Sequence, residues 1–314
     1  MYLDPVRWLL FAGTLRRVYD GDVIIFVRRT NGWVERFARQ QRIFLRRLDR
    51  VEHDLERRNI ERFPHYAAAC SSYSWCLAID FRDSYFQRHP FTSAPGGIER
   101  VAAGAEVILQ QELGSPIAGN PYNIGWLTHC FGDKFARSVS ANQPVCGGSM
   151  FITPKGMRSF MKGFCSSLWR RIDGQDRACI DQGILNALAY GSRTPRDDGV
   201  RWLVQQSGSP RSSQLVNHVG GVWPADVLEA MPSTYRDSEG FVLEGDGNRS
   251  AVVHQYDRYK KLRKFACWLS VQLFLDTTQR PPLLTSSALT ELRQIRERVG
   301  DPCLWADAAA ARVL

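Results

Sequence analysis

The sequence predicts an α/β protein, because short apolar strands alternate with helical segments along roughly the first 190 residues. The runs at 22–27, 75–79 and 105–109 are nearly continuous in apolar residues, which is typical of strands that are covered on both faces. A strand, a helix and a further strand usually form a unit whose two strands are parallel. The alternation therefore predicts helices layered on a largely parallel sheet.

The other elements of the first half follow from periodicity and from turn-forming residues. A helix over 3–20 is expected to end at Tyr19-Asp20-Gly21, because Asp and Gly favour turns. The remaining segments of this half are predicted, in order, as a mostly helical stretch over 33–62 with a short strand at 43–45, and a loop rich in Pro, Gly and Asn over 114–125.

The second half opens with a predicted glycine turn at 146–148, which leads into a strand ending at 152. No internal repeat and no clear linker interrupt this half. Its remaining segments are predicted, in order, as helices over 154–171 and 179–190, strand-like stretches broken by Gly and Pro over 200–253, and a charged helix over 285–298.

The net charge of +9 is the unusual figure in a composition that is otherwise typical of a globular protein, with 44% hydrophobic and 23% charged residues in a chain of 314. A basic surplus is typical of proteins that bind nucleic acids or acidic membrane surfaces. Only six of the 41 basic residues are lysine, and the basic residues are spread along the chain, some as isolated arginine pairs beside Asp and Glu, such as Arg16-Arg17 and Arg28-Arg29. We therefore expect no nucleic-acid partner.

A membrane anchor is expected to be absent from this chain. No basic segment and long apolar stretch follow Met1. The best apolar run, 265–275, is about half the roughly 20 residues that a bilayer span needs. Because a basic cluster at 260–264 precedes it, this segment is either a helix in the membrane interface or, as we favour, a helix docked on the domain.

The eight cysteines are scattered and form no C-x-x-C pair, so the sequence contains no zinc-ribbon spacing. They are also too sparse for a disulfide scaffold. We expect mostly buried free thiols, with pairing in an oxidising compartment as the alternative. The cysteines are Cys70, Cys76, Cys130, Cys146, Cys165, Cys179, Cys267 and Cys303.

Two carboxylates, Asp80 and Asp83, follow directly on the predicted strand 75–79. Ligands of open α/β sheets bind at the carboxyl ends of the strands. Paired carboxylates there offer oxygen ligands to Mg²⁺ or Mn²⁺, and either ion binds a diphosphate. The alternative interpretation is structural: these residues cap the next helix or pair with Arg82 and Arg88.

Three later features suit the same chemistry, and each also has a structural interpretation. The Gly147-Gly148 pair permits close approach of backbone to a ligand, or simply forms a turn. Asp181 is a candidate acid near a substrate, or an acid favoured by the dipole of a helix N-terminus. His254 follows an apolar strand and would complete a metal site, although a lone histidine is more often structural.

In this order, the pieces resemble the GT-A type nucleotide-diphospho-sugar transferase domains found in plants, algae and related eukaryotes. The resemblance covers roughly residues 5–260 and includes a helix-to-strand passage at 13–23. Its motifs are D-x-x-D-x-x-F-Q-x-x-P-F at Asp80, Asp83, Phe86, Gln87, Pro90 and Phe91, a glycine motif at Cys146, Gly148 and Gly156, D-Q-G-x-x-N at Asp181, Gln182, Gly183 and Asn186, and V-V-H-Q-Y-D-R at 252–258.

The resemblance implies a GT-A-like, Rossmann-type mixed sheet flanked by helices over 1–262, followed by a helical C-terminal extension over 263–314. Because the chain begins almost at its first helix, we expect the opening β-strand of such folds to be missing. Members of the family are often Golgi enzymes, so the resemblance also implies the Golgi or another secretory lumen.

The activity implied is a Mn²⁺- or Mg²⁺-dependent transfer of a sugar from a nucleotide diphosphate donor to a hydroxyl of a glycan or glycoprotein acceptor. Two alternatives are a catalytically silent relative that only binds and, less favoured, a basic nucleic-acid-binding protein. The resemblance assigns the metal to Asp80, Asp83 and His254, the general base or substrate-orienting role to Asp181, and donor or acceptor binding to Arg82, Gly147, Gly148, Gln182 and Asn186.

Overall fold

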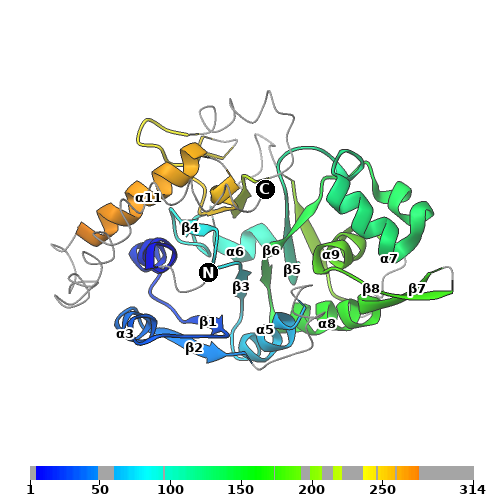
Figure 1. Cartoon of the computed structure of the whole chain (residues 1–314), viewed down its shortest axis with the longest axis horizontal. Helices are drawn as coiled ribbons and strands as arrows, with labels where there is room; N and C mark the ends of the chain where they lie inside the picture. The colour runs from blue at the N-terminus through cyan, green and yellow to red at the C-terminus, as the bar shows by residue number, and fades with distance from the viewer. Residues whose placement is uncertain are drawn as a thin grey trace.

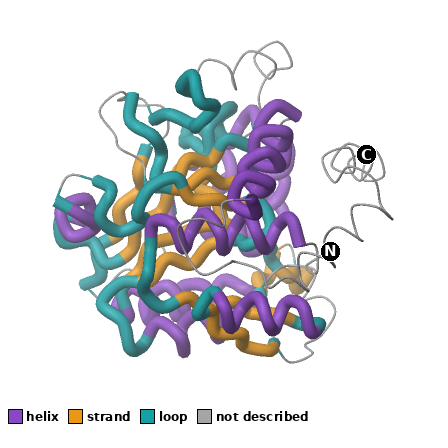
Figure 2. Tube along the Cα trace, turned by 90° about the vertical axis from the view of Figure 1, so that its left-hand side faces the viewer, coloured by secondary structure: helices purple, strands orange, loops and turns teal. Residues whose placement is uncertain are grey.

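The protein is a mixed α/β structure, as the sequence predicts, and helices flank its central strands (Figures 1 and 2). It was obtained as a computed structural model. The structure describes residues 5–48, 60–94, 96–172, 174–191, 199–206, 215–220, 236–244, 247–258 and 260–275.

The central sheet has four described strands and runs through the middle of the molecule (Figure 1). Its order is β3 (Cys76–Ile79), β6 (Val145–Ile152), β5 (Val107–Gln111) and β9 (Trp202–Gln205). Among hydrogen-bonded neighbours only β5 and β9 are parallel, whereas β6 is antiparallel to both β3 and β5. The sheet is therefore mixed, as the resemblance implies, and the expectation of a largely parallel sheet fails at β6, because the helical connection from β5 to β6 returns the chain at the same end of the sheet. Alternation along the chain does not reveal that reversal.

A second sheet joins segments that are far apart in the sequence. It consists of β10 (Val216–His218), β11 (Val252–His254) and β4 (Ser84–Phe86), and every residue in it is buried. β11 is parallel to β10 and antiparallel to β4, in a register that places His254 opposite Ser84. This pairing brings the C-terminal histidine to the turn between β3 and β4, where both candidate carboxylates lie.

The N-terminal region forms a separate layer around the parallel pair β1 (Val23–Val27) and β2 (Ile43–Arg47), which α3 (Gly32–Gln40) connects. Both strands confirm the predictions from sequence. Among the described strands, β1 pairs only with β2 and β3 only with β6. The unpaired edges of β1 and β3 line one cavity of about 290 Å³, which extends to Arg62 and Asp80.

The predicted helices at the N-terminus, at 154–171 and at 179–190 are present, with adjusted ends. The segment 3–20 becomes α1 (Pro5–Trp8), a π-helical turn η1 (Leu9–Gly13) and α2 (Thr14–Val18). The remaining helical and hairpin elements are α5 (Arg62–Cys70), α6 (Gly97–Ala102), the 3₁₀ turn η2 (Ile117–Gly119), α7 (Pro121–Val139), α8 (Pro154–Leu168), the hairpin β7 (Trp169–Ile172) and β8 (Gln175–Ala178), α9 (Asp181–Tyr190), the 3₁₀ turn η3 (Tyr256–Arg258) and α11 (Lys260–Leu275).

Helix α7 begins inside the stretch that was predicted as loop over 114–125. The side chain of Asn120 accepts hydrogen bonds from the backbone N–H groups of Tyr122 and Asn123, and Pro121 occupies the first helical position. Both are signals for a helix start. The Pro, Gly and Asn content that indicated a loop therefore marks, in its second part, the beginning of a long helix.

Helix α11 is docked on the body of the protein, which confirms the favoured interpretation of 265–275. Leu262, Phe265 and Leu269 of α11 belong to the same buried cluster as Leu10 and Tyr85. No helix in the described part of the chain is long and apolar enough to cross a membrane. The predicted boundary after residue 262 falls within α11, and the predicted helix over 285–298 lies outside the described residues.

Disulfides join Cys70 to Cys76 and Cys130 to Cys179. Cys267 is disulfide-bonded as well. The expectation of mostly free thiols is therefore wrong, because these partners are brought together by folding rather than by a recognisable spacing. Two described cysteines are free: Cys146, which is buried, and Cys165, which is exposed.

Candidate metal centre

Asp80, Asp83 and His254 converge at the carboxyl end of β3, with ligand atoms that all lie within 4.8 Å of one another. Backbone hydrogen bonds hold the segments together. The N–H of Asp80 donates to the carbonyl of Gly148 in β6, and the N–H of Gln255 donates to the carbonyl of Asp83, each at 2.8 Å. The structure thus brings together the three residues that the sequence predicts as metal ligands.

The ring of His254 is oriented by Ser84, the residue opposite it in the β4–β11 ladder. The Ser84 hydroxyl donates to the carbonyl of Asp80 at 2.6 Å and lies 3.2 Å from Nδ1 of His254. Since that hydroxyl proton is used, Ser84 accepts the proton of Nδ1, and Nε2 carries the free lone pair. Metal-binding histidines usually donate their other N–H to an oxygen in this way.

Gly148 lies inside β6, not in a turn, and its lack of a side chain makes room for His254. A Cβ at this position would lie 2.6 Å from Nε2 of His254 and 3.1 Å from Oδ2 of Asp80. A glycine within a strand often marks such a close approach. The turn interpretation of Gly147-Gly148 is therefore wrong. At Gly147 a Cβ would make only ordinary contacts, with its nearest neighbour in Gln182 at 3.6 Å.

Asp83 is buried and keeps one carboxylate oxygen unpaired. Its Oδ2 accepts a hydrogen bond from Arg82 at 3.0 Å, whereas Oδ1 has no hydrogen-bond partner among the described residues. Burial acts to raise the pKa of Asp83, but its interactions with the neighbouring His254 and Arg82 outweigh it and lower the pKa. The predicted pairing with Arg82 is thus confirmed for one oxygen, and the other is a buried anionic oxygen with the chemistry of a cation ligand.

Arg62 is a site residue that the sequence did not indicate. From the start of α5, its guanidinium donates to Oδ1 of Asp80 at 2.5 Å, to Oδ2 of Asp181 at 2.9 Å and to the carbonyl of Gly147 at 3.1 Å. It therefore links the candidate metal ligands to Asp181 and leaves Oδ2 of Asp80 on the side of Gly148. Within the Arg-rich stretch 33–62, nothing in the local pattern distinguishes it from its neighbours.

Asp181 is the first residue of α9, and it is buried. Burial raises the pKa of Asp181 to about 6, and the negative charges of Asp80 and Glu61 add to this; the charge of Arg62 and the N–H of Gln182 oppose it. Oδ1 accepts that N–H at 2.7 Å, so the helix-terminus interpretation holds as well. A carboxyl whose pKa lies near neutrality is suited to proton transfer.

The other predicted binding residues differ in how they meet this site. Arg82 is partly exposed beside Asp83, and the Gln182 amide donates to Glu112. Asn186 is fully buried, and its amide is bonded to the backbone of Val145 and to other protein groups. Asn186 thus connects α9 to β6 by hydrogen bonds, and a substitution there would affect a ligand only by moving these two elements. The binding roles of these residues stay predictions.

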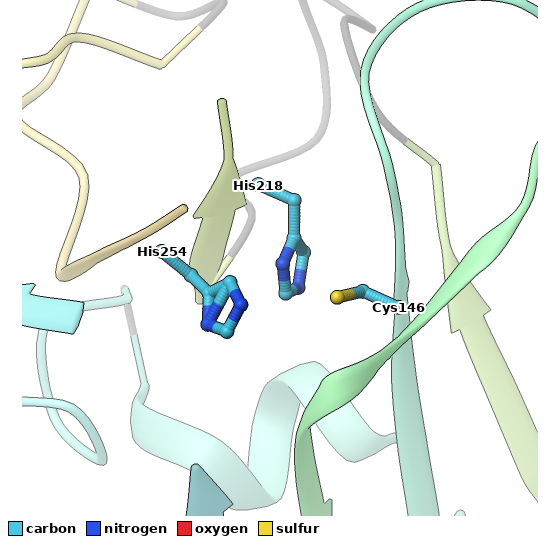
Figure 3. Close-up of side chains that lie close together, drawn as sticks. All are labelled: Cys146, His218 and His254. Carbon is cyan, nitrogen blue, oxygen red and sulfur yellow. The ribbon is translucent and has the colours of Figure 1, made fainter. Parts of the chain in front are cut away.

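A second group of potential ligands shares His254. Cys146 of β6, His218 of β10 and His254 of β11 point toward one another from three strands (Figure 3), and their ligand atoms also lie within 4.8 Å of one another. Burial, together with the charge of Glu112, raises the pKa of Cys146 well above its usual value. Burial, together with the neighbouring His254 and Arg258, lowers the pKa of His218.

His218 was not singled out from sequence, although it ends β10 as His254 ends β11. That position is the signal that would have singled it out. Its proximity to Cys146 depends on the β10–β11 pairing, which no local pattern indicates.

The chain was compared with known proteins. No model of a protein family matches it, and no curated protein sequence matches it either.

Proposed function

We propose that the protein is a GT-A-like, metal-dependent glycosyltransferase that moves a sugar from a nucleotide diphosphate donor to a hydroxyl of a glycan or glycoprotein acceptor. The observation that carries this proposal is the convergence of Asp80, Asp83 and His254 at the end of β3, with a buried oxygen of Asp83 left unpaired. The ordered sequence motifs described above supply the resemblance to such enzymes.

The residues present fit Mn²⁺ or Mg²⁺. Two carboxylates and one imidazole form a donor set suited to these ions, and the buried Oδ1 of Asp83 has no hydrogen-bond partner among the described residues. Asp80, Asp83 and Nε2 of His254 would hold the ion. Its chemistry when bound is to neutralise the negative charge of the departing diphosphate.

The remaining groups act on the donor and the acceptor. In the transfer, the acceptor oxygen bonds to the sugar carbon as the bond from that carbon to the diphosphate oxygen breaks. Asp181 takes the proton that the acceptor hydroxyl loses, which typically contributes about 10²- to 10⁴-fold to the rate. Arg82, partly exposed beside Asp83, offers positive charge to the diphosphate, while Gly147 and Gln182 lie beside Asp181, and Gly148 lies beside Asp80 and His254.

The disulfides support a secretory compartment. Disulfides persist in oxidising surroundings and are rare in the reducing cytosol. Two described pairs, Cys70–Cys76 and Cys130–Cys179, join elements that carry site residues: α5 to β3, and α7 to the segment before Asp181. We therefore place the enzyme in the Golgi or another secretory lumen.

A second candidate function is nucleotide-sugar binding without catalysis. The observation that favours it is Arg62, which pairs with both Asp80 and Asp181 and so partly satisfies the two acids that the transfer needs. In such a protein the donor binds while the acceptor proton is never removed.

The experiment that separates these functions is a thermal-shift panel of nucleotide sugars with and without Mn²⁺, followed by transfer assays with the donor that binds. A ligand that binds the native state raises its apparent stability. The enzyme predicts a Mn²⁺-dependent shift and sugar transfer, with both lost in Asp83→Asn. Asp237→Asn, at a partly exposed ion pair with Arg249, is the matched control. A shift without transfer supports the binding protein, and no shift with any donor contradicts both functions.

A further inference from the structure

We propose that Cys146, His218 and His254 form a second metal site, selective for a thiolate- and imidazole-binding ion such as Zn²⁺, and that this site competes with the carboxylate site for His254. The inhibition of sugar transfer that follows from this competition rests on the proposed function. The binding of Zn²⁺ does not.

The three side chains are positioned and shielded as a protein metal site requires. Their exposed fractions are 2% for Cys146, 0% for His218 and 2% for His254, and they reach the same point from three neighbouring strands (Figure 3). Ligand atoms of a tetrahedral zinc site lie about 3.3–3.8 Å apart. Since the atoms here lie within 4.8 Å of one another, small side-chain rotations suffice to close the set.

The hydrogen bonds of His218 leave a buried nitrogen without a partner. Its Nε2 lies 3.0 Å from the hydroxyl of Ser149, and that hydroxyl donates to the side-chain carbonyl of Gln110. Ser149 therefore accepts the proton of Nε2, and Nδ1 carries the lone pair. Nδ1 is buried and has no hydrogen-bond partner among the described residues, which is costly unless a ligand satisfies it.

The two histidines are held in the same manner. Ser84 accepts the proton of His254 as Ser149 accepts that of His218, so each ring offers one unprotonated nitrogen. An N–H that is donated to a neighbouring oxygen is the usual outer support of a metal-binding histidine. What an ordinary buried histidine does not need is a second ring nitrogen left unpaired, as Nδ1 of His218 is among the described residues.

The donor atoms also determine which ion is preferred. A thiolate and two imidazoles are typical ligands of Zn²⁺ and copper, whereas Mn²⁺ and Mg²⁺ prefer carboxylates. As the metal–sulfur bond forms, Cys146 loses its proton to solvent, so binding releases one proton and strengthens as pH rises.

Competition between the sites follows from the single free nitrogen of His254. Nδ1 is committed to Ser84, and both ligand sets therefore depend on Nε2. One lone pair binds one ion. Zn²⁺ at Cys146 and His218 consequently removes a ligand from the site of Asp80 and Asp83, and the affinity of that site for Mn²⁺ falls.

In the test, CoCl₂ or ZnCl₂ is added stepwise to the full chain with its disulfides intact, and no organic ligand is present. Co²⁺ is expected to give a sulfur-to-metal charge-transfer band that Zn²⁺ abolishes, and Zn²⁺ is expected to release bound Mn²⁺ as followed by electron paramagnetic resonance. Cys146→Ser should lose the band and roughly 100-fold or more in Zn²⁺ affinity, while it still binds Mn²⁺. Cys165→Ser, at the exposed free cysteine, is the matched control and should retain both.

Several results would overturn the proposal: no charge-transfer band, a band that depends on Cys165 instead of Cys146, or Zn²⁺ and Mn²⁺ bound together without competition. If Cys146→Ser does not fold, His218→Gln replaces it, because it keeps both the thiol and the carboxylate site in place. It should weaken Zn²⁺ binding by roughly 100-fold while it still binds Mn²⁺, and an unchanged Zn²⁺ affinity contradicts the site. A chain that binds Zn²⁺ as described but transfers no sugar keeps this site and loses only the proposed function.

Discussion

The two sides of His254 differ in the ligands they offer and in their access to solvent. On one side are carboxylates, and the side chain of Asp80 is 36% exposed. On the other side are the buried thiol of Cys146 and the buried imidazole of His218. An accessible oxygen side suits an ion that meets an exchanging diphosphate substrate, whereas the enclosed side suits an ion that exchanges slowly. One histidine, held by Ser84, thus lies between two sets of potential ligands that suit different ions.

Asp83→Asn gives the largest expected effect, because it removes a charged ligand from the carboxylate side only. Mn²⁺ affinity should fall by more than the roughly 100-fold that loss of an outer hydrogen-bond partner can cost. Zn²⁺ affinity should remain unchanged. Calorimetric titration with each metal measures the two affinities. Mn²⁺ affinity equal to that of the unmodified protein would contradict the assignment of Asp83 as a ligand.

Gly148→Ala tests whether the two sides share one ring. The added methyl would lie 2.3 Å from Cε1 of His254, so the ring must move. Overpacking of this kind typically costs about 1–3 kcal/mol, which corresponds to roughly tenfold to hundredfold in affinity. Both Mn²⁺ and Zn²⁺ should bind more weakly. The control is Gly125→Ala, where a Cβ meets nothing within 4 Å; a loss confined to one metal would show that the ring is not shared.

The pH profile of sugar transfer tests whether Asp181, which Arg62 connects to Asp80 on the carboxylate side, accepts the proton of the acceptor hydroxyl. Because the pKa of Asp181 is raised to about 6, the carboxyl is protonated below that pH and cannot accept the acceptor proton. The rate constant kcat/KM should fall about tenfold per pH unit below about 6 and level off above it. Asp181→Asn should abolish this dependence together with most of the activity. A profile that is flat through pH 6 contradicts the role of Asp181.

The same shift has a consequence for stability. The pKa of Asp181 in the folded protein lies above its ordinary value of 3.8, so the folded state binds more protons between about pH 4 and pH 6. Its contribution to the free energy of unfolding is therefore lost as pH rises through this range. Denaturant unfolding of the native chain and of Asp181→Asn, compared at both ends of the range, measures the difference.

Ser84→Ala gives the smallest expected effect, because it changes the support of the shared ring and no ligand. Without the hydroxyl, Nδ1 of His254 loses the acceptor that fixes its proton. Affinity for both metals should fall about tenfold, at the low end of the usual range for such partners. Equal affinities in the variant and the unmodified protein, measured by the same titrations, would show that Ser84 does not orient His254.

Local sequence was sufficient for most helices and strands and for the carboxylate side of the site. β1, β3 and β5 are short apolar runs, and Asp80 and Asp83 follow β3 within four residues, so strand and ligands are found in one stretch. The start of α7 also has a local signal, the capping residue Asn120 followed by Pro121, but the Gly and Asn residues around it favoured a loop. Composition outweighed the capping signal there.

The reversal of β6, the disulfide pairs, the contact of Arg62 with two acids and the group of Cys146 with His218 are properties of the folded chain. Each joins residues distant in sequence, and hydrophobic periodicity reports only whether a residue faces the interior, never which other residue it meets there. The free nitrogen of His254 illustrates the limit. Sequence shows a histidine after an apolar strand, but the pairing of β11 with β4 provides Ser84, and Ser84 selects the nitrogen that remains free to bind a metal.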